Sequence, residues 1–318
     1  MATGIIAIAA RQQGFARLAW VLFAAAAVAL AACWLLLAAR LLRHPARVLA
    51  DLQDHPRSAG FFTAVAGTAV VGSAGIAVGA WPGAASALWA VAAGTWLVLG
   101  YALFFGLTIA AQKPRLEQGI NGSWLLAVVA TQSLSVLAGL LSPGLAPPLR
   151  VHLDFVALCA WLAGGMLYSW QITLIFYRYM FLPFRPADLT PTYWINMGAM
   201  AISTLAGARL VLDAPQAQFL EGMLPFLRGV TILYWATGTW WLPLLLLLTV
   251  WKHLVRREPV RYEFAQWSVV FPLGMYSAAT HEMSQALGLE FLGGLETAFF
   301  WAAVAAWIGV AAGMLRRR

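Results

Sequence analysis

Charged side chains are scarce in this chain. Only 10% of its 318 residues are Asp, Glu, Lys or Arg, whereas soluble domains carry roughly 25%. Hydrophobic residues make up 62% of the chain, and the mean hydropathy is +0.78. Because a soluble globule needs far more charge at its surface, this composition excludes that class and predicts an integral membrane protein.

Cysteine is also scarce, and the motifs of enzymes are missing. The two cysteines, Cys33 and Cys159, lie inside apolar segments, and we interpret them as packing residues rather than as a disulfide or a metal pair. The five histidines are scattered, and the chain has no HExxH or CxxC spacing and no phosphate-binding glycine loop. We therefore expect no enzyme activity, no metal, no cofactor and no ATP-driven step.

Long apolar segments are abundant instead. They approach or exceed the roughly 20 residues that a helix needs to cross a bilayer, and the strands of a barrel would be short and alternating. Nine such segments span about 16–42, 60–80, 86–111, 122–141, 151–176, 193–212, 226–251, 265–287 and 291–315. A tenth apolar piece, 1–10, is half as long, and we expect that the chain begins inside a first helix. The sequence predicts one domain, 1–318, of ten transmembrane helices.

Two textures alternate along these segments. The segment 61–80 is rich in Gly, Ala, Ser and Thr, whereas 86–111 carries Leu, Trp, Tyr and Phe, and the other odd and even segments repeat the contrast. Helices of small residues can pack closely, whereas bulky side chains can face lipid. We expect five helical hairpins with an inner ring of five odd-numbered helices around a central pore. The alternative is a tight bundle in which small residues merely let the helices touch.

The basic residues lie in alternate loops, and the positive-inside rule assigns the richer set to the cytoplasm. That set contains Arg40, Arg43, Arg47, Arg57, Lys113, Arg115, Arg178, Arg185, Lys252, Arg256, Arg257, Arg261, Arg316, Arg317 and Arg318, and the other set contains Arg11, Arg17, Arg150, Arg209 and Arg228. Ten helices with both termini cytoplasmic account for this split. The net charge of +8 therefore reflects loops in the membrane protein and not a nucleic-acid partner.

Four stretches carry a family resemblance. They are MATGIIAIAA (1–10), LLRHPARVLADLQDHPRSAGFF (41–62), PTYWINMGAMAISTLAG (191–207) and WSVVFPLGMYSAAT (267–280). Together they resemble the tellurite-resistance and C4-dicarboxylate transporter family, which includes the slow anion channels of plant guard cells. The resemblance implies ten helices around a pore, a homotrimer in a bacterial plasma membrane, and small inorganic or organic anions as partners.

The same resemblance implies a gate at Phe271, followed by Pro272. An aromatic ring across a narrow, water-poor channel is a steric and dewetting barrier, and a proline inside a helix removes a backbone donor and favours a bend. The alternative is that Phe271 is an ordinary core or lipid-facing aromatic residue.

Polar side chains are few in the predicted inner helices. The candidates for lining the pore are Thr63, Thr68, Gln132, Ser135, Asn196, Ser203 and Ser268, with Ser277 further along the last of these helices. Such neutral groups could replace part of the hydration shell of an ion, or they could equally bond across helices. Five helix N-termini and the basic loops would add a positive vestibule on the cytoplasmic side.

Ionisable groups at the predicted outer mouth complete the set of candidates. Glu282 lies eleven residues beyond Phe271, hence on nearly the same helix face. An anion pathway tolerates this carboxylate if Glu282 pairs with Arg209 or Arg228, or if it is protonated during transport. His281 fits a surface position, and Asp154 fits a cap or a partner of Arg150.

These observations predict an anion channel or facilitator that conducts down the electrochemical gradient. The alternative in the same family is a proton-coupled carrier of C4-dicarboxylates, or a carrier related to sulfite or tellurite. A closed membrane scaffold or receptor bundle is the alternative from another class.

Overall fold

The computed structural model describes residues 1–79 and 81–316, so Arg317 and Arg318 of the basic C-terminal run lie outside it. Each predicted apolar segment contains a helix. The ten principal helices are α1 (Ala2–Gln12), α2 (Ala16–Arg43), α5 (Phe62–Ala77), α6 (Pro82–Ile109), α8 (Leu126–Leu141), α9 (Pro147–Phe181), α10 (Ile195–Asp213), α12 (Leu224–Val250), α13 (Trp267–Leu287) and α14 (Gly293–Arg316). Short helices occupy the connections: α3 (Pro45–Gln53), α4 (His55–Ser58), α7 (Leu116–Gly119) and α11 (Gln218–Glu221). No strand occurs in the described parts of the chain.

Eight helical segments are long and apolar enough to cross a bilayer, counted over the described residues. The remaining two principal helices differ from them: α1 has only 11 residues, and α13 carries polar residues such as His281 and Glu282 near its C-terminal end. The prediction of an α-helical membrane protein is therefore confirmed.

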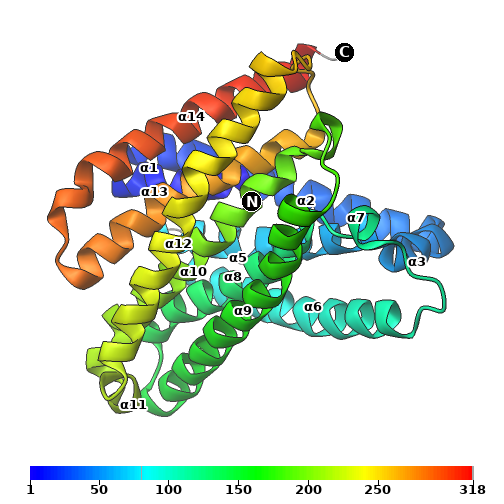
Figure 1. The fold of residues 1–318 in the computed structure, drawn as a ribbon. Coiled ribbons are helices and arrows are strands. Elements are labelled where there is room, and N and C mark those ends of the chain that lie inside the picture. The colour runs from blue at the N-terminus through cyan, green and yellow to red at the C-terminus, as the bar shows by residue number, and fades with distance from the viewer. Residues whose placement is uncertain (80, 317–318) are drawn as a thin grey trace.

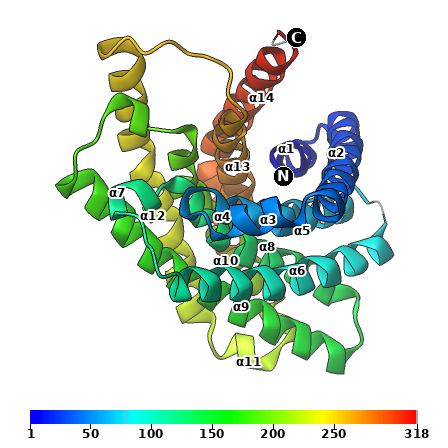
Figure 2. The same cartoon turned by 90° about the vertical axis from the view of Figure 1, so that its right-hand side faces the viewer.

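The principal helices pack as five consecutive pairs, each of a small-residue helix and a bulky one. The pairs are α1 with α2, α5 with α6, α8 with α9, α10 with α12, and α13 with α14. The small-residue helices also touch one another in a closed cycle that runs from α1 to α5, α8, α10, α13 and back to α1. Figure 1 shows α1 running alongside α13, and Figure 2 shows α1 between α2 and α13. These five helices are called the inner helices below.

The small-residue helices and the bulky helices also differ clearly in how much of their surface is buried. Of the most apolar 18-residue window, 89% is buried in the segments that contain α8 and α10, but only 17% in α2 and α6. The bulky helices thus turn large side chains outward, where lipid would solvate them. Cys33 and Cys159 are free and exposed on α2 and α9, so their interpretation as packing residues was wrong. A thiol is small and weakly polar, which suits an outward face as well as a core.

The inner helices all run in one direction. Their C-terminal ends meet around one cavity, described below. At the opposite end, α5, α8, α10 and α13 each begin directly after a 3-10 turn: η1 (Ala59–Phe61), η2 (Gly122–Leu125), η5 (Pro191–Trp194) and η8 (Phe264–Gln266). These four turns touch in sequence, η1 to η2 to η5 to η8. The basic loops precede these turns, so the end with the helix N-termini is also the end rich in Lys and Arg.

Tryptophan side chains tie the pairs to one another. In each case an outer helix donates an indole N–H to the inner helix of the next pair: Trp34 to Thr68, Trp89 to the Leu134 carbonyl, Trp96 to Thr131, Trp161 to the Ser203 carbonyl, Trp235 to Thr280 and Trp307 to Thr3. The last bond links α14 back to α1, which closes the cycle. Buried indoles normally find an acceptor, and here the acceptors fix the order of the helices around the ring.

Candidate functional site

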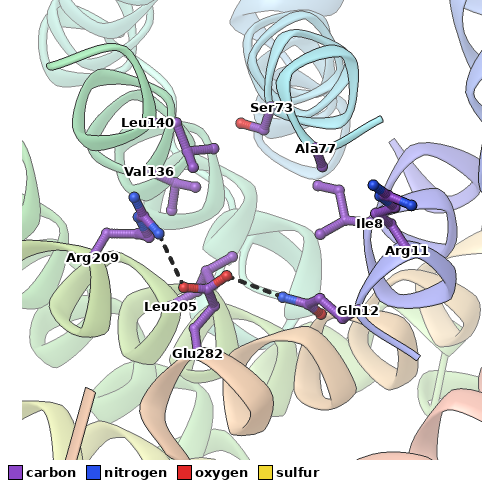
Figure 3. A pocket seen from close by; sticks show the side chains of 10 residues that line it. All are labelled: Ile8, Arg11, Gln12, Ser73, Ala77, Val136, Leu140, Leu205, Arg209 and Glu282. Atoms are coloured by element: carbon purple, nitrogen blue, oxygen red, sulfur yellow. Dashed lines mark hydrogen bonds and ion pairs between the residues drawn. The ribbon is translucent and has the colours of Figure 1, made fainter. Parts of the chain in front are cut away.

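A cavity of about 220 Å³ opens where the five inner helices end. Each inner helix contributes at least one lining residue, and among the residues that the structure describes no outer helix contributes any. The lining residues are Ile8, Arg11, Gln12, Ser73, Ala77, Val136, Leu140, Leu205, Arg209 and Glu282 (Figure 3). The cavity therefore lies on the axis of the ring, and its lining is half apolar and half polar.

Three polar side chains of the cavity, Gln12, Glu282 and Arg209, are connected to one another. Arg209 Nη1 lies 3.2 Å from Glu282 Oε2, and Gln12 Nε2 donates to Glu282 Oε1 at 3.2 Å. Arg209 also lies 3.8 Å from Asp213 one turn further along α10. Arg11 lines the cavity from α1, on the other side from Arg209, as Figure 3 shows. The pairing of Glu282 with Arg209 is one of the two that the sequence suggested, and it joins α13 to α10.

Beyond this cavity the axis narrows to a constriction. A second space of about 10 Å³ shares four lining residues with the first and adds Ile5, Val70, Ser133, Ile202 and Met275. A single water needs roughly 10–15 Å³, so no hydrated ion fits here. The two serines of the constriction, Ser73 and Ser133, donate to carbonyls of their own helices. The constriction is thus apolar and closed.

Phe271 lies on the same helix as the constriction residue Met275, four residues before it. It is fully buried, and a spacing of four places the two side chains on one face of α13, one turn apart. Glu282, which lines the cavity, lies seven residues beyond Met275 and on the same face of α13. Pro272, inside α13, packs against Gly198 of α10.

The polar residues predicted from the first two long inner helices bond away from the cavity. Thr63 is exposed and donates to the Gly60 carbonyl. Thr68 is buried and accepts the N–H of Trp34 from α2. Gln132 and Ser135 share one face of α8, as their spacing suggested, and donate to backbone carbonyls of α9 at 3.0 and 2.7 Å.

The candidates on α10 and α13 show the same preference. Asn196 donates weakly to Tyr179 of α9 at 3.4 Å, and Ser203 donates to the Ala199 carbonyl of its own helix. Ser277 donates to the Glu296 carbonyl of α14, whereas Ser268 is half-buried near the start of α13. Among the predicted residues, only Arg209 and Glu282 line the cavity, and the role of the others in lining the pore stays a prediction.

Comparison with known proteins adds the decisive observation. The sequence profile described as "Voltage-dependent anion channel" (SLAC1) matches residues 1–315. The chain belongs to the voltage-dependent anion channel family. The resemblance identified from the four sequence stretches is thus confirmed.

Individual relatives agree with this family. The chain is similar to "Uncharacterized membrane protein MT1776" of Mycobacterium tuberculosis (strain CDC 1551 / Oshkosh), with 43% identity over 137 residues, which cover 42% of this chain and 68% of that protein. It is also similar to "Uncharacterized transporter MJ0762" of Methanocaldococcus jannaschii, with 24% identity over 189 residues, or 59% of this chain and 54% of that protein. A second transporter of that archaeon, "Uncharacterized transporter MJ0576", is 23% identical over 182 residues, covering 57% of this chain and 51% of that protein.

Two further charged groups of this voltage-dependent anion channel family member are buried: Arg178, whose contacts the sequence did not predict, and Asp154. Arg178, at the end of α9, is 6% exposed and donates to the Ile120 carbonyl at 2.5 Å and to Tyr193 Oη at 2.7 Å. It therefore binds α9 to η5 and to the residue that follows α7, shortly before η2. Asp154 is fully buried on α9 and faces Arg150 at 3.9 Å, which agrees with the partner suggested for it. The spacing of four between Arg150 and Asp154 was visible in the sequence, whereas the acceptors of Arg178 were not.

Proposed function

We propose that this protein conducts small anions along the axis of its inner helices, through a pathway closed at rest by the constriction and by Phe271. The observation that carries the proposal is the continuity of the axis: one cavity, whose described lining residues all come from the inner helices, leads to a space too small for a hydrated ion. Membership of an anion channel family supports the choice of cargo.

We further propose that the ten principal helices are five transmembrane hairpins, with both termini on the cytoplasmic side of a bacterial plasma membrane. The packing of consecutive helices in pairs and the common direction of the inner helices support this topology. The basic loops then lie in the cytoplasm, where they and five helix N-termini attract anions to the inner entrance. A homotrimer, as the family resemblance implies, would give each subunit its own pathway.

In this proposal, Phe271 is the gate and Pro272 positions it. Phe271 lies on the same face of α13 as Met275 and one turn further from the cavity. Its ring would therefore extend the apolar barrier by about one helical turn. The amide of Pro272 cannot donate to the Ser268 carbonyl four residues earlier, which leaves α13 easier to bend beside the gate. A bend at Pro272 would swing Phe271 relative to the cavity.

The test is the conductance of the purified protein in planar bilayers. Phe271→Ala should raise the basal anion conductance by roughly tenfold or more, equivalent to lowering the barrier by about 1.4 kcal/mol or more. The matched control is Phe105→Ala, because Phe105 lies on α6 and is 66% exposed. Equal conductance of the Phe271→Ala variant and the wild type, at equal amounts of reconstituted protein, would contradict the gate.

The second candidate function is a proton-coupled carrier of C4-dicarboxylates. Carboxylates beside the cavity favour it, since Glu282 lines the cavity and Asp213 lies next to Arg209. In proteoliposomes a carrier would show saturable malate uptake that collapses with a protonophore, whereas a channel would pass current without a pH gradient. A closed scaffold would show neither, even after Phe271→Ala. Sulfite and tellurite belong in the same flux comparison.

A further inference from the structure

We propose that Arg209 and Arg11 form an anion-binding site in the cavity, and that Glu282 occupies this site as a tethered carboxylate that competes with the incoming anion. The proposal rests on the proposed function, because it assigns the residues that would first hold a conducted anion on this side of the constriction. The expected ligands are small oxyanions and carboxylates, whose oxygens match the donors of a guanidinium.

The walls of the cavity make it a poor place for an unpaired charge. Leucine, isoleucine, valine and alanine supply five of its ten lining residues, so an ion inside loses water and needs protein donors. The cavity supplies these donors on two sides: Arg209 on α10 and Arg11 on α1 (Figure 3). Among residues 1–79 and 81–316, no carboxylate forms an ion pair with Arg11.

Glu282 already binds Arg209 in the way that a free carboxylate would. Its Oε2 lies 3.2 Å from Arg209 Nη1, and its Oε1 accepts from Gln12 at 3.2 Å. Both side chains of the ion pair are only 19% exposed, so solvent screens the pair weakly. An anion that binds Arg209 must displace Glu282 and tolerate its charge nearby.

Several buried polar atoms at the same place lack a partner. Arg209 Nε and Gln12 Oε1 make no hydrogen bond within the described residues, and neither does Asp213 Oδ2, on a side chain that is only 5% exposed. Unpaired buried groups are costly, and an anion can satisfy the donor Arg209 Nε but neither of the two acceptor oxygens. The free Arg209 Nε is a donor that an incoming oxyanion can use.

The size of the site limits the ligand. At roughly 30 Å³ for each water, a volume of about 220 Å³ corresponds to about seven waters. Nitrate fits easily in this volume, and so does a short dicarboxylate. The competing carboxylate keeps binding weak, which suits an ion that must leave again.

The test is isothermal titration of the purified full chain with nitrate, in a detergent solution buffered with HEPES. Glu282→Gln should bind nitrate at least about tenfold more tightly than the wild type, because removing a competing charge-assisted interaction is typically a gain of that order. The double variant Glu282→Gln with Arg209→Gln should lose the gain. The matched control is Glu221→Gln, which removes an exposed carboxylate on α11 and should leave the affinity unchanged.

Two further variants keep the proposal falsifiable. Glu282→Asp draws the carboxylate back by one carbon from Arg209 and should give an intermediate gain, and it decides the matter if Glu282→Gln does not fold. Arg11→Gln in the Glu282→Gln background should weaken succinate binding more than nitrate binding, because succinate has a second carboxylate that can bind Arg11 while the first binds Arg209.

The proposal is overturned if folded Glu282→Gln binds nitrate no more tightly than the wild type, or if the gain survives Arg209→Gln. The outcome is separate from that of the proposed function. Tight nitrate binding with no flux, even after Phe271→Ala, would remove the channel but leave the site. Nitrate flux that is unaffected by changes at Glu282 and Arg209 would remove the site but leave the channel.

Discussion

Gly198 of α10 and Pro272 of α13 lie in direct contact. A Cβ atom at position 198 would fall 2.7 Å from Cγ of Pro272 and 3.3 Å from its Cα. The two residues belong to the two sequence stretches that most clearly carry the family resemblance, YWINMG and FPLGMY. Glycine is thus required at this position by the close approach of a rigid ring, directly beside the proposed gate at Phe271.

Gly198→Ala should lower the stability of the protein. The added methyl group meets a proline ring that cannot rotate away, so α13 must shift, and overpacking of this kind costs about 1–3 kcal/mol. The measurement is thermal unfolding of the purified protein in detergent. The control is Gly229→Ala on α12, where a Cβ would meet nothing within 4 Å. An unfolding temperature of Gly198→Ala equal to or above that of the wild type would show that α10 and α13 separate without cost.

The Trp96–Thr131 contact is a second test of the ring. The indole N–H of Trp96 donates to Thr131 Oγ1 at 2.7 Å and joins the second pair of helices to the third. Trp96→Phe should cost about 0.5–1.5 kcal/mol through the lost hydrogen bond, in addition to the loss of buried area. The measurement is a double-mutant cycle with Thr131→Val on unfolding in detergent. Trp170→Phe is the control, because Trp170 is 62% exposed on α9.

A coupling energy near zero in that cycle would mean that packing alone holds the ring together. Hydrogen bonds between membrane helices average about 0.6 kcal/mol in such cycles, so a coupling of that size is expected here. Each indole hydrogen bond would then add little to the free energy of unfolding, and the six together would stabilise the ring.

The helices and their division into two textures could be predicted from the sequence because both depend on local composition. The segment 61–80, rich in small residues, became the buried helix α5, and the bulky segment 86–111 became the exposed helix α6. The pairing of Glu282 with Arg209 was also within reach, since a carboxylate inside a membrane helix needs a partner.

The orientation of the small polar residues could not be predicted. The inner helices are buried on nearly every side, so no amphipathic stripe indicates which face turns to the axis. Thr68 and Gln132 could each bond to the outer helices or line the pathway, and they bond to α2 and α9. The lining residue Ser73 gave no signal of its own, because its position depends on how five distant segments assemble.

The loop before α10 allows a prediction for the effect of pH. Asp188 lies between the candidate membrane segments that end at Phe181 and begin at Pro191. Its carboxylate accepts from the backbone N–H of Arg185 at 2.9 Å and from the Arg185 guanidinium at 3.2 Å. The Arg185 guanidinium, aided by the more distant Arg178, holds the pKa of Asp188 below its ordinary value.

A pKa that is lower in the folded state means that the charged form of Asp188 stabilises the fold. This contribution is complete above the pKa of the unfolded chain, about 3.9, and is lost as the pH falls through the lower pKa of the folded state. Asp188→Asn should therefore unfold at a lower temperature than the wild type at pH 7, by an amount that corresponds to a few tenths to about 1 kcal/mol. The difference should shrink steadily below about pH 4.

The measurement is thermal unfolding at a series of pH values for the wild type, Asp188→Asn and the control Glu263→Gln. Glu263 is exposed and forms no ion pair in the described portion of the chain, so its removal should give curves parallel to those of the wild type. Asp188 also lies 3.9 Å from Arg178, which donates to the Ile120 carbonyl and to Tyr193 near the N-terminal ends of the inner helices. Loss of Asp188 should therefore loosen that end of the bundle first. If the gap between Asp188→Asn and the wild type stays constant from pH 7 to pH 3, the stabilisation comes from the shape of the turn and not from the charge of the carboxylate.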